Sequence, residues 1–198
     1  MNVGVLALQG DVSEHIAALE SAMKRLGLDG KVIPVRRTSE LANASALLMP
    51  GGESTTIAKQ LQRFGLREPI IEFAMAGKPV MGTCAGCILL AKEILDQKGP
   101  EEVRPLGLID ISIRRNAFGR QKESFERPIK ITGLEQDFPG IFIRAPKIER
   151  ISETVESLAM LGKEHIMVKQ GNVLALTFHP ELGTDDRVHA LFLKMLRP

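Results

Sequence analysis

Short apolar runs alternate with helical patterns through the first half of the chain, and this alternation limits the possible folds more than any other feature. The runs are continuous enough to be buried on both faces of a sheet. They are "VGVLAL" (3–8), "KVIPVR" (31–36), "ALLMP" (46–50) and "KPVMGT" (78–83). Strands that alternate with helices predict an α/β fold, with an open, mostly parallel sheet flanked by helices.

The second half changes character, because its apolar runs are shorter and fewer helical patterns separate them. These runs are "IDISIRR", "RPIKIT", "IFIRAP", "IMVKQ" and "VLALTF". Gly171-Asn172 separates the last two runs and predicts a hairpin turn. We therefore expect extra antiparallel strands here. The chain of 198 residues contains no repeat or linker, so we expect a single domain, 1–198.

The helices carry recognisable start signals. Asp11 and Glu14 are spaced like a capping box, and Ser54 or Thr55 could cap the helix after a glycine loop. The first helix has an apolar stripe formed by Ile16, Leu19, Met23 and Leu26. Further helices are expected over 55–64, 68–76, 85 to about 95, and within "TDDRVHALFLKML" near the end.

Charge and composition exclude several classes of function. The net charge of +2 and the absence of an aromatic platform argue against nucleic-acid binding. No apolar run is long enough to span a membrane, and the N-terminus lacks the pattern of a signal peptide. Two cysteines do not make a disulfide framework, so a reducing cytoplasm is the expected location.

Both cysteines lie in one stretch, "GTCAGC" (82–87), which permits two interpretations. The spacing of Cys84 and Cys87 is that of a redox couple. The flanks of Cys84, Gly82 and Gly86, are instead typical of a nucleophile on a sharp turn between a strand and a helix. The start of that helix stabilises an anion, which favours the thiolate.

We favour the nucleophile, with Cys87 as a small packing residue, because a redox couple does not explain the glycines. A redox couple and buried structural thiols remain alternatives. A zinc site is disfavoured, since there is no second cysteine pair and none of the four histidines has ligand spacing. We expect no metal.

A cysteine nucleophile needs a base, and "TFHPE" (177–181) supplies a candidate. His179 follows an apolar strand, Pro180 turns the chain, and Glu181 can orient the imidazole. His15 and His189 fall on expected helices, so packed or solvated roles are expected for them. The glycine loop "PGGES" (50–54) could turn backbone N–H groups toward an oxyanion.

"PGGES", "GTCAG" and "FHPE" together resemble the class I (triad) glutamine amidotransferases. "LQGDVSEH" (8–15), "RNAFGRQ" (115–121), "FIRAP" (142–146) and "FHPEL" (178–182) narrow the resemblance to the glutaminase subunits of pyridoxal 5′-phosphate synthases. The resemblance spans nearly the whole chain. It implies hydrolysis of L-glutamine to L-glutamate and ammonia through a Cys-His-Glu triad and a thioester.

The resemblance also implies roles for individual residues. Cys84, His179 and Glu181 would form the triad, and backbone N–H groups of Gly52 and Ala85 would form the oxyanion hole. The implied glutamine-binding residues are Gly52, Glu53, Ser54, Arg115, Ile143 and Arg144.

The implied partner is a synthase subunit with a (β/α)₈-barrel fold that receives the ammonia for vitamin B6 biosynthesis, and no cofactor is implied for this chain. Gln9 is the candidate residue for coupling to that partner, with Glu14 and His15 on a segment that the partner could touch. The alternatives are the glutaminase subunit of another amidotransferase such as imidazole glycerol phosphate synthase, a non-hydrolytic regulatory subunit, and a cysteine peptidase or chaperone-like relative.

Overall fold

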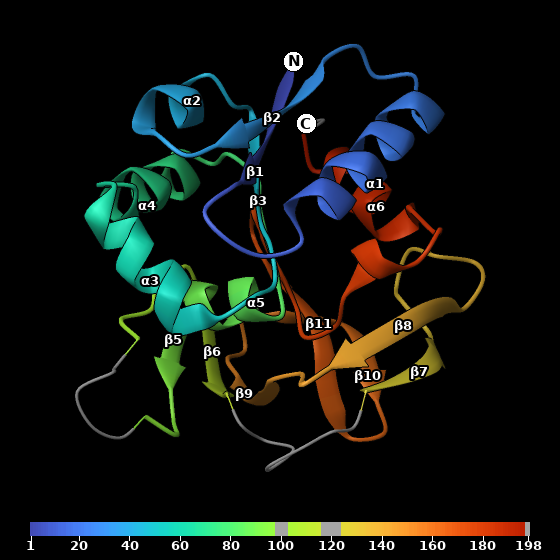
Figure 1. Ribbon diagram of the computed structural model, residues 1–198. Helices are drawn as coiled ribbons and strands as arrows, with labels where there is room; N and C mark the ends of the chain where they lie inside the picture. The colour runs from blue at the N-terminus through green and yellow to red at the C-terminus, as the bar shows by residue number, and fades with distance from the viewer. Residues whose placement is uncertain (98–102, 116–123, 197–198) are drawn as a thin grey trace.

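The computed structural model describes residues 1–97, 103–115 and 124–196 (Figure 1). Its main sheet has ten strands among these residues, in the order β2-β1-β3-β4-β12-β11-β9-β6-β5, with β10 beside β11. The first five strands of this order run parallel to one another. They are β2 (Lys31–Val35), β1 (Asn2–Leu6), β3 (Ala46–Met49), β4 (Val80–Thr83) and β12 (Val173–Leu176). The expected parallel sheet is confirmed.

The remaining strands are mainly antiparallel, as expected for the second half. They are β5 (Ala91–Ile94), β6 (Ile109–Arg114), β9 (Lys147–Ile151), β10 (Glu156–Leu161) and β11 (Glu164–Gln170). The antiparallel pair of β11 and β12 confirms the hairpin at Gly171-Asn172. A separate two-stranded sheet joins β7 (Ser124–Ile129) to β8 (Phe138–Ile143).

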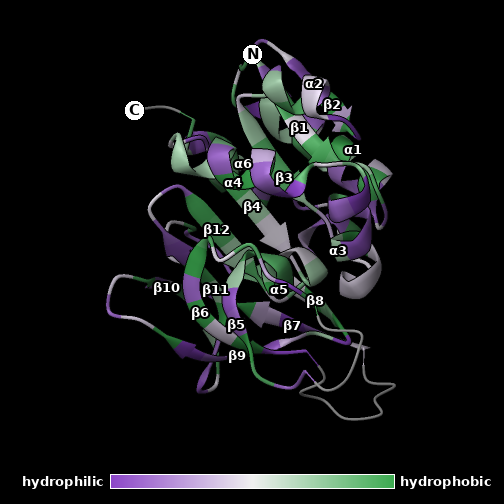
Figure 2. Ribbon diagram, turned by 90° about the vertical axis from the view of Figure 1, so that its left-hand side faces the viewer, coloured by the Kyte–Doolittle hydropathy of each residue, from purple (hydrophilic) through white to green (hydrophobic). Residues whose placement is uncertain are grey.

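Helices cover both faces of the parallel strands (Figure 1). One face carries α1 (Val12–Arg25) and α6 (Arg187–Lys194). The other carries α2 (Thr38–Ala42), α3 (Ser54–Arg63), α4 (Arg67–Met75) and α5 (Ala85–Leu90). Each face has its own apolar core, and hydrophobic residues dominate α5 and β12 in Figure 2. Among the described residues, no helix is both long and apolar enough to cross a membrane.

The structure corrects three local expectations. The helix expected over 85–95 ends at Leu90, and the chain continues as β5, because pairing with β6 outweighs local helix propensity. Asp11 makes no side-chain cap on α1, so the capping box is wrong. The N-cap of α3 is Glu53, not Ser54 or Thr55, and its carboxylate accepts the backbone N–H groups of Thr55 and Thr56.

The parallel arrangement places three loops together. β3, β4 and β12 are neighbours with a common direction, so their carboxyl ends lie at one edge of the sheet. The glycine loop follows β3, Cys84 follows β4, and His179 lies three residues beyond β12. Open α/β sheets place their functional sites at this edge.

Candidate active site

Cys84 occupies a strained turn between β4 and α5. Its backbone has φ 47° and ψ −103°, a region that residues with side chains rarely adopt. Its backbone N–H donates to the Leu176 carbonyl at 2.9 Å, which ties the turn to the end of β12. The thiol therefore lies at the start of a helix, in the sharp turn that the flanking glycines predict.

The flanking glycines are required by close backbone contacts. A Cβ atom at Gly86 would lie 2.2 Å from the Met49 carbonyl oxygen, and one at Gly82 would lie 2.6 Å from the Gly86 carbonyl carbon. Real Cβ atoms do not approach that closely, so a side chain at either position would displace β3 or the turn itself.

Cys87 is fully buried in the core on the α3 and α4 side of the sheet. Burial raises the pKa of its thiol, and the nearby Cys84 adds to the rise. A thiol held neutral and away from solvent is a poor partner for thiol exchange. The geometry therefore favours a packing role for Cys87 over a redox couple with Cys84.

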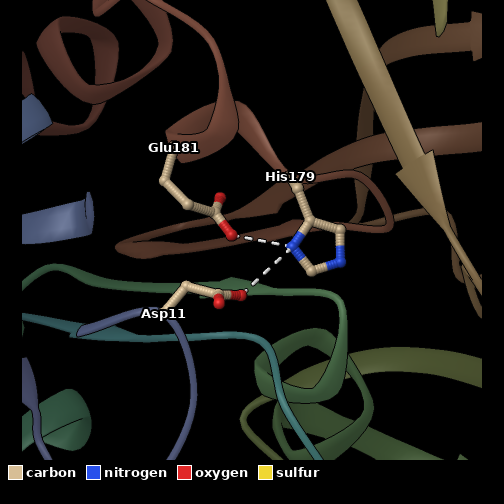
Figure 3. Close-up of side chains that lie close together, drawn as sticks. All are labelled: Asp11, His179 and Glu181. Atoms are coloured by element: carbon tan, nitrogen blue, oxygen red, sulfur yellow. Dashed lines mark hydrogen bonds and ion pairs between the residues drawn. The ribbon is translucent and has the colours of Figure 1, made fainter. Parts of the chain in front are cut away.

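His179 and Glu181 form a buried pair at the end of β12 (Figure 3). Glu181 Oε1 lies 2.7 Å from His179 Nδ1, and each residue is 5% exposed. The 3₁₀ helix η1 (Pro180–Leu182) holds the two side chains on one side of the turn. The His179 backbone N–H donates to the Ile141 carbonyl at 2.8 Å, which anchors the base to β8.

The electrostatics of the pair favour a charged imidazole. Burial lowers the pKa of His179, but hydrogen bonds with Cys84 and Glu181, together with their charges, outweigh it and raise the pKa to about 10. Burial raises the pKa of Glu181, and the hydrogen bond with His179 opposes that rise. We take Glu181 as ionised near neutral pH, because an imidazolium N–H at 2.7 Å requires an acceptor. The arrangement places a charged imidazole beside the Cys84 sulfur.

Asp11 joins this cluster, which sequence reasoning missed. Its Oδ2 lies 3.8 Å from His179 Nδ1, and its side chain is 41% exposed (Figure 3). One donor atom from each of Asp11, His179 and Glu181 falls within 4.8 Å of the others, a grouping that could hold a metal ion. His179 Nδ1 is already bonded to Glu181, so a metal would have to displace that bond. The absence of a metal stays a prediction.

The glycine loop passes directly over the candidate nucleophile and base. A Cβ atom at Gly51 would lie 2.7 Å from His179 Cε1 and 3.5 Å from Cys84 Cβ. Gly52 has φ +132°, in the region that favours glycine. Ala85 begins α5, so its backbone N–H has no partner within the helix. Gly52 and Ala85 therefore lie on the two backbone segments that border Cys84.

Glu53 and Arg115 lie together at the start of α3. The Arg115 guanidinium donates to Thr55 Oγ1 at 2.9 Å and lies 3.6 Å from Glu53 Oε1. Burial raises the pKa of Glu53, but hydrogen bonds from Thr56 and Thr55 outweigh it and lower the pKa to about 2. Ser54 is buried in the first turn of α3. The site thus offers a carboxylate and a guanidinium side by side.

Ile143 and Arg144 lie at the end of β8, two and three residues beyond the carbonyl that anchors His179. Arg144 has φ 43°, the second positive φ angle at a residue other than glycine among those described. Of the motif "RNAFGRQ", Arg115 is described, and residues 116–121 lie outside the described residues.

Gln9 contacts the glycine loop from the end of β1. Its Oε1 accepts the Glu53 backbone N–H at 3.0 Å, and a Cβ atom at Gly52 would lie 3.0 Å from the same oxygen. The side chain therefore holds the loop that carries the candidate oxyanion N–H group.

His15 and His189 lie buried behind Glu181. The packed role, one of the two expected for His15, is confirmed, because its side chain is fully buried and therefore out of a partner's reach. Its Nε2 lies 3.3 Å from Glu181 Oε2. His189 is also fully buried and contacts His15. His15 lies four residues before Leu19, and that spacing places it on the buried stripe of α1. This signal was present in the sequence.

The sequence matches the SNO glutamine amidotransferase family over residues 5–197. It is 48% identical over 195 residues to the pyridoxal 5′-phosphate synthase subunit PdxT of Thermococcus gammatolerans, with 98% of each chain covered. The PdxT subunit of Pyrococcus horikoshii is 50% identical over 195 residues, again with 98% of each chain covered. A crystal structure of a glutamine amidotransferase is similar with a TM-score of 0.86 and 47% identity, covering 98% of both chains.

Proposed function

The chain belongs to the SNO glutamine amidotransferase family. From this premise we propose that it is the glutaminase subunit of a pyridoxal 5′-phosphate synthase. Its catalytic residues in this proposal are Cys84, His179 and Glu181. The activity and the subunit role rest on the family and on the PdxT relatives. The observation that carries the triad is the 2.7 Å contact of His179 with Glu181 beside the strained turn at Cys84.

The first half of the reaction makes a thioester. The Cys84 thiolate attacks the side-chain amide carbon of glutamine, and the carbonyl electrons move onto the oxygen. Backbone N–H groups of Gly52 and Ala85 donate to this oxyanion. The imidazolium of His179 gives its proton to the departing nitrogen, so the C–N bond breaks, ammonia leaves and a glutamyl thioester remains.

The second half releases glutamate. Neutral His179 accepts a proton from water as the oxygen attacks the thioester carbon. The C–S bond then breaks, and the thiolate–imidazolium pair returns. Glu181 stays ionised throughout and holds the imidazole in one orientation.

The substrate pocket uses the remaining polar residues around the loop. Arg115 and Arg144 are suited to the α-carboxylate of glutamine, and Glu53 is suited to the α-ammonium. Glu53 already serves as the N-cap of α3, which fixes its carboxylate in place before substrate arrives. Gly52, Ser54 and Ile143 complete the proposed pocket.

The partner in this proposal is a (β/α)₈-barrel synthase subunit that consumes the ammonia. Gln9 is the proposed link, because its amide holds the Glu53 N–H next to the Gly52 peptide. Docking that moves Gln9 would shift the loop between two states with different oxyanion geometry. His15 has no part in a docking surface, since it is buried. The cytoplasmic location stays a prediction.

The test is ammonia release from glutamine by the wild type and by Gln9→Ala, each with and without the synthase subunit. The proposal predicts glutaminase activity that rises when the synthase is added, and a smaller rise for Gln9→Ala. No ammonia release under either condition would refute the function. Normal binding and activation of Gln9→Ala would refute the route through Gln9.

A further inference from the structure

A row of buried polar side chains continues from Glu181 into the protein interior. Glu181 Oε2 lies 3.3 Å from His15 Nε2, and His15 Nδ1 lies 3.0 Å from His189 Nε2. His15 Nε2 also lies 3.2 Å from Thr83 Oγ1, at the end of β4. These four residues come from η1, α1, α6 and β4, so the row ties together the elements that meet behind the site.

Both histidines of the row are neutral near neutral pH. Burial lowers the pKa of His15, and the charges of His189 and His179 lower it further. Burial also lowers the pKa of His189, to about 4, against a smaller opposing effect of Asp186. A neutral imidazole carries one N–H group and one acceptor nitrogen, so the order of donors along the row is limited to two arrangements.

The first arrangement places the proton of His15 on Nε2. This N–H then donates to Thr83 Oγ1 at 3.2 Å, and Glu181 Oε2 lies 3.3 Å from the same nitrogen. His15 Nδ1 accepts from His189 Nε2–H, which leaves His189 Nδ1 as an unprotonated nitrogen. Among the described residues, His189 Nδ1 is indeed a buried atom without a hydrogen bond. Every N–H in the row has an acceptor.

The second arrangement places the proton of His15 on Nδ1. His189 would then accept at Nε2 and carry its own proton on Nδ1, as a buried donor without a partner. His15 Nε2 would face Glu181 Oε2 at 3.3 Å with a lone pair against a carboxylate. Both features are costly, since buried donors are rarely left unpaired and the two acceptors repel.

We infer that His15, with its proton on Nε2 and its tautomer set by His189, is a positioning residue that holds the second carboxylate oxygen of Glu181. This inference rests on the proposed function of Glu181. Glu181 Oε2 is a buried atom without a hydrogen bond among the described residues, and His15 Nε2 lies 3.3 Å from it. Oε1 is bonded to His179, so the two contacts together fix the rotation of the carboxylate.

The contact of His15 with Glu181 matters to catalysis because the Glu181 carboxylate must stay ionised although it is buried. The titratable and charged groups that face Glu181 are His179, His15 and Asp11, and the charge of Asp11 raises the pKa of the carboxyl. The groups that face His15 are His189, His179 and Glu181. Loss of the His15 donor would raise the pKa of Glu181 further.

The tautomer can be measured in the wild-type protein without any substitution. Long-range ¹H–¹⁵N spectra of ¹⁵N-histidine-labelled protein at pH 7 distinguish Nδ1–H from Nε2–H in each ring. The inference predicts Nε2–H for both His15 and His189. Nδ1–H at His15, or a protonated His15, would overturn it. This result does not depend on activity, so a wild type that releases no ammonia would refute the proposed function and leave this measurement standing.

The kinetic test compares His15→Phe with His15→Gln in the complex with the synthase subunit, after melting curves show folded protein. His15→Phe should lower kcat about 10- to 100-fold with KM unchanged, because the N–H group beside the buried charge of Glu181 is lost. The acid limb of the pH–kcat profile of His15→Phe should move to higher pH by about one unit, because the pKa of Glu181 rises. His15→Gln, whose amide can donate from a similar position, should recover most of both effects.

The matched control is His165→Gln, at a partly buried histidine on β11 that bonds Ser157. Its kcat and pH profile should equal those of the wild type. A folded His15→Phe with wild-type kcat and an unmoved acid limb would overturn the inference. If His15→Phe does not fold, the tautomer measurement on the wild type decides the inference: Nε2–H at His15 supports it and Nδ1–H overturns it.

Discussion

Replacement of Glu181 by glutamine tests how strongly the carboxylate holds His179 in its charged form. The substitution keeps the size of the side chain and removes its charge. The rise of the His179 pKa from 6.5 to about 10 corresponds to about 5 kcal/mol of preference for the imidazolium. Interactions with Cys84 and Glu181 together produce this preference, and they also compensate for burial, which lowers the pKa of His179. We assign roughly half of it, about 2–3 kcal/mol, to Glu181.

This energy predicts a loss of kcat/KM of roughly 30- to 150-fold in Glu181→Gln. The pKa of His179 should fall, because the neutral amide no longer favours the imidazolium. The alkaline limb of the pH profile should therefore move to lower pH. The loss should be smaller than in His179→Asn, where the base itself is absent and several orders of magnitude are expected.

The assay is ammonia release from glutamine with the synthase subunit present, measured from pH 6 to 10.5 for each variant. Glu156→Gln is the control, since it removes an exposed carboxylate on β10 that pairs with Lys169. A Glu181→Gln enzyme within threefold of the wild type, with an unmoved alkaline limb, would refute the reasoning. A loss as complete as that of Cys84→Ala would assign Glu181 a more direct role.

Three further predictions concern the other parts of the site. Cys84→Ala should abolish glutaminase activity, whereas Cys87→Ala should largely retain it in a folded protein; an inactive, folded Cys87→Ala would restore the redox interpretation. Arg115→Ala and Arg144→Ala should mainly raise KM in steady-state assays, and an unchanged KM in both would remove them from the pocket. Glu53→Ala should lower the free energy of unfolding by about 1 kcal/mol, because the cap of α3 is lost, and should also raise KM. A denaturant titration that shows no change in stability would contradict the capping role.

The parallel half of the sheet and the elements of the proposed site could be predicted from local pattern. Continuous apolar runs predict strands that are buried on both faces, and the glycines that flank Cys84 predict the turn there. The start of β5 could not be predicted in this way. Leu90 and Ala91 continue the apolar run of α5, and what ends the helix there is pairing with β6, a contact with residues 109–113.

The buried row behind the triad was missed for a related reason. Asp11 and Glu14 have the spacing of a cap, but Asp11 instead turns toward His179, on a loop 168 residues later in the chain. His15 was placed on a segment that the partner could touch, although its spacing from Leu19 marks the buried face. Sequence spacing identifies a helix face, but the polar partners on that face come from distant parts of the fold.

The central claim is that glutamine hydrolysis passes through a thioester on Cys84. The direct measurement is acid quenching of the complex during turnover of ¹⁴C-labelled glutamine, followed by peptide mapping. The account predicts label on the peptide that carries Cys84, lost on treatment with hydroxylamine and absent in Cys84→Ala. Turnover by the wild type with label on another residue, or undiminished turnover by Cys84→Ala, would contradict it.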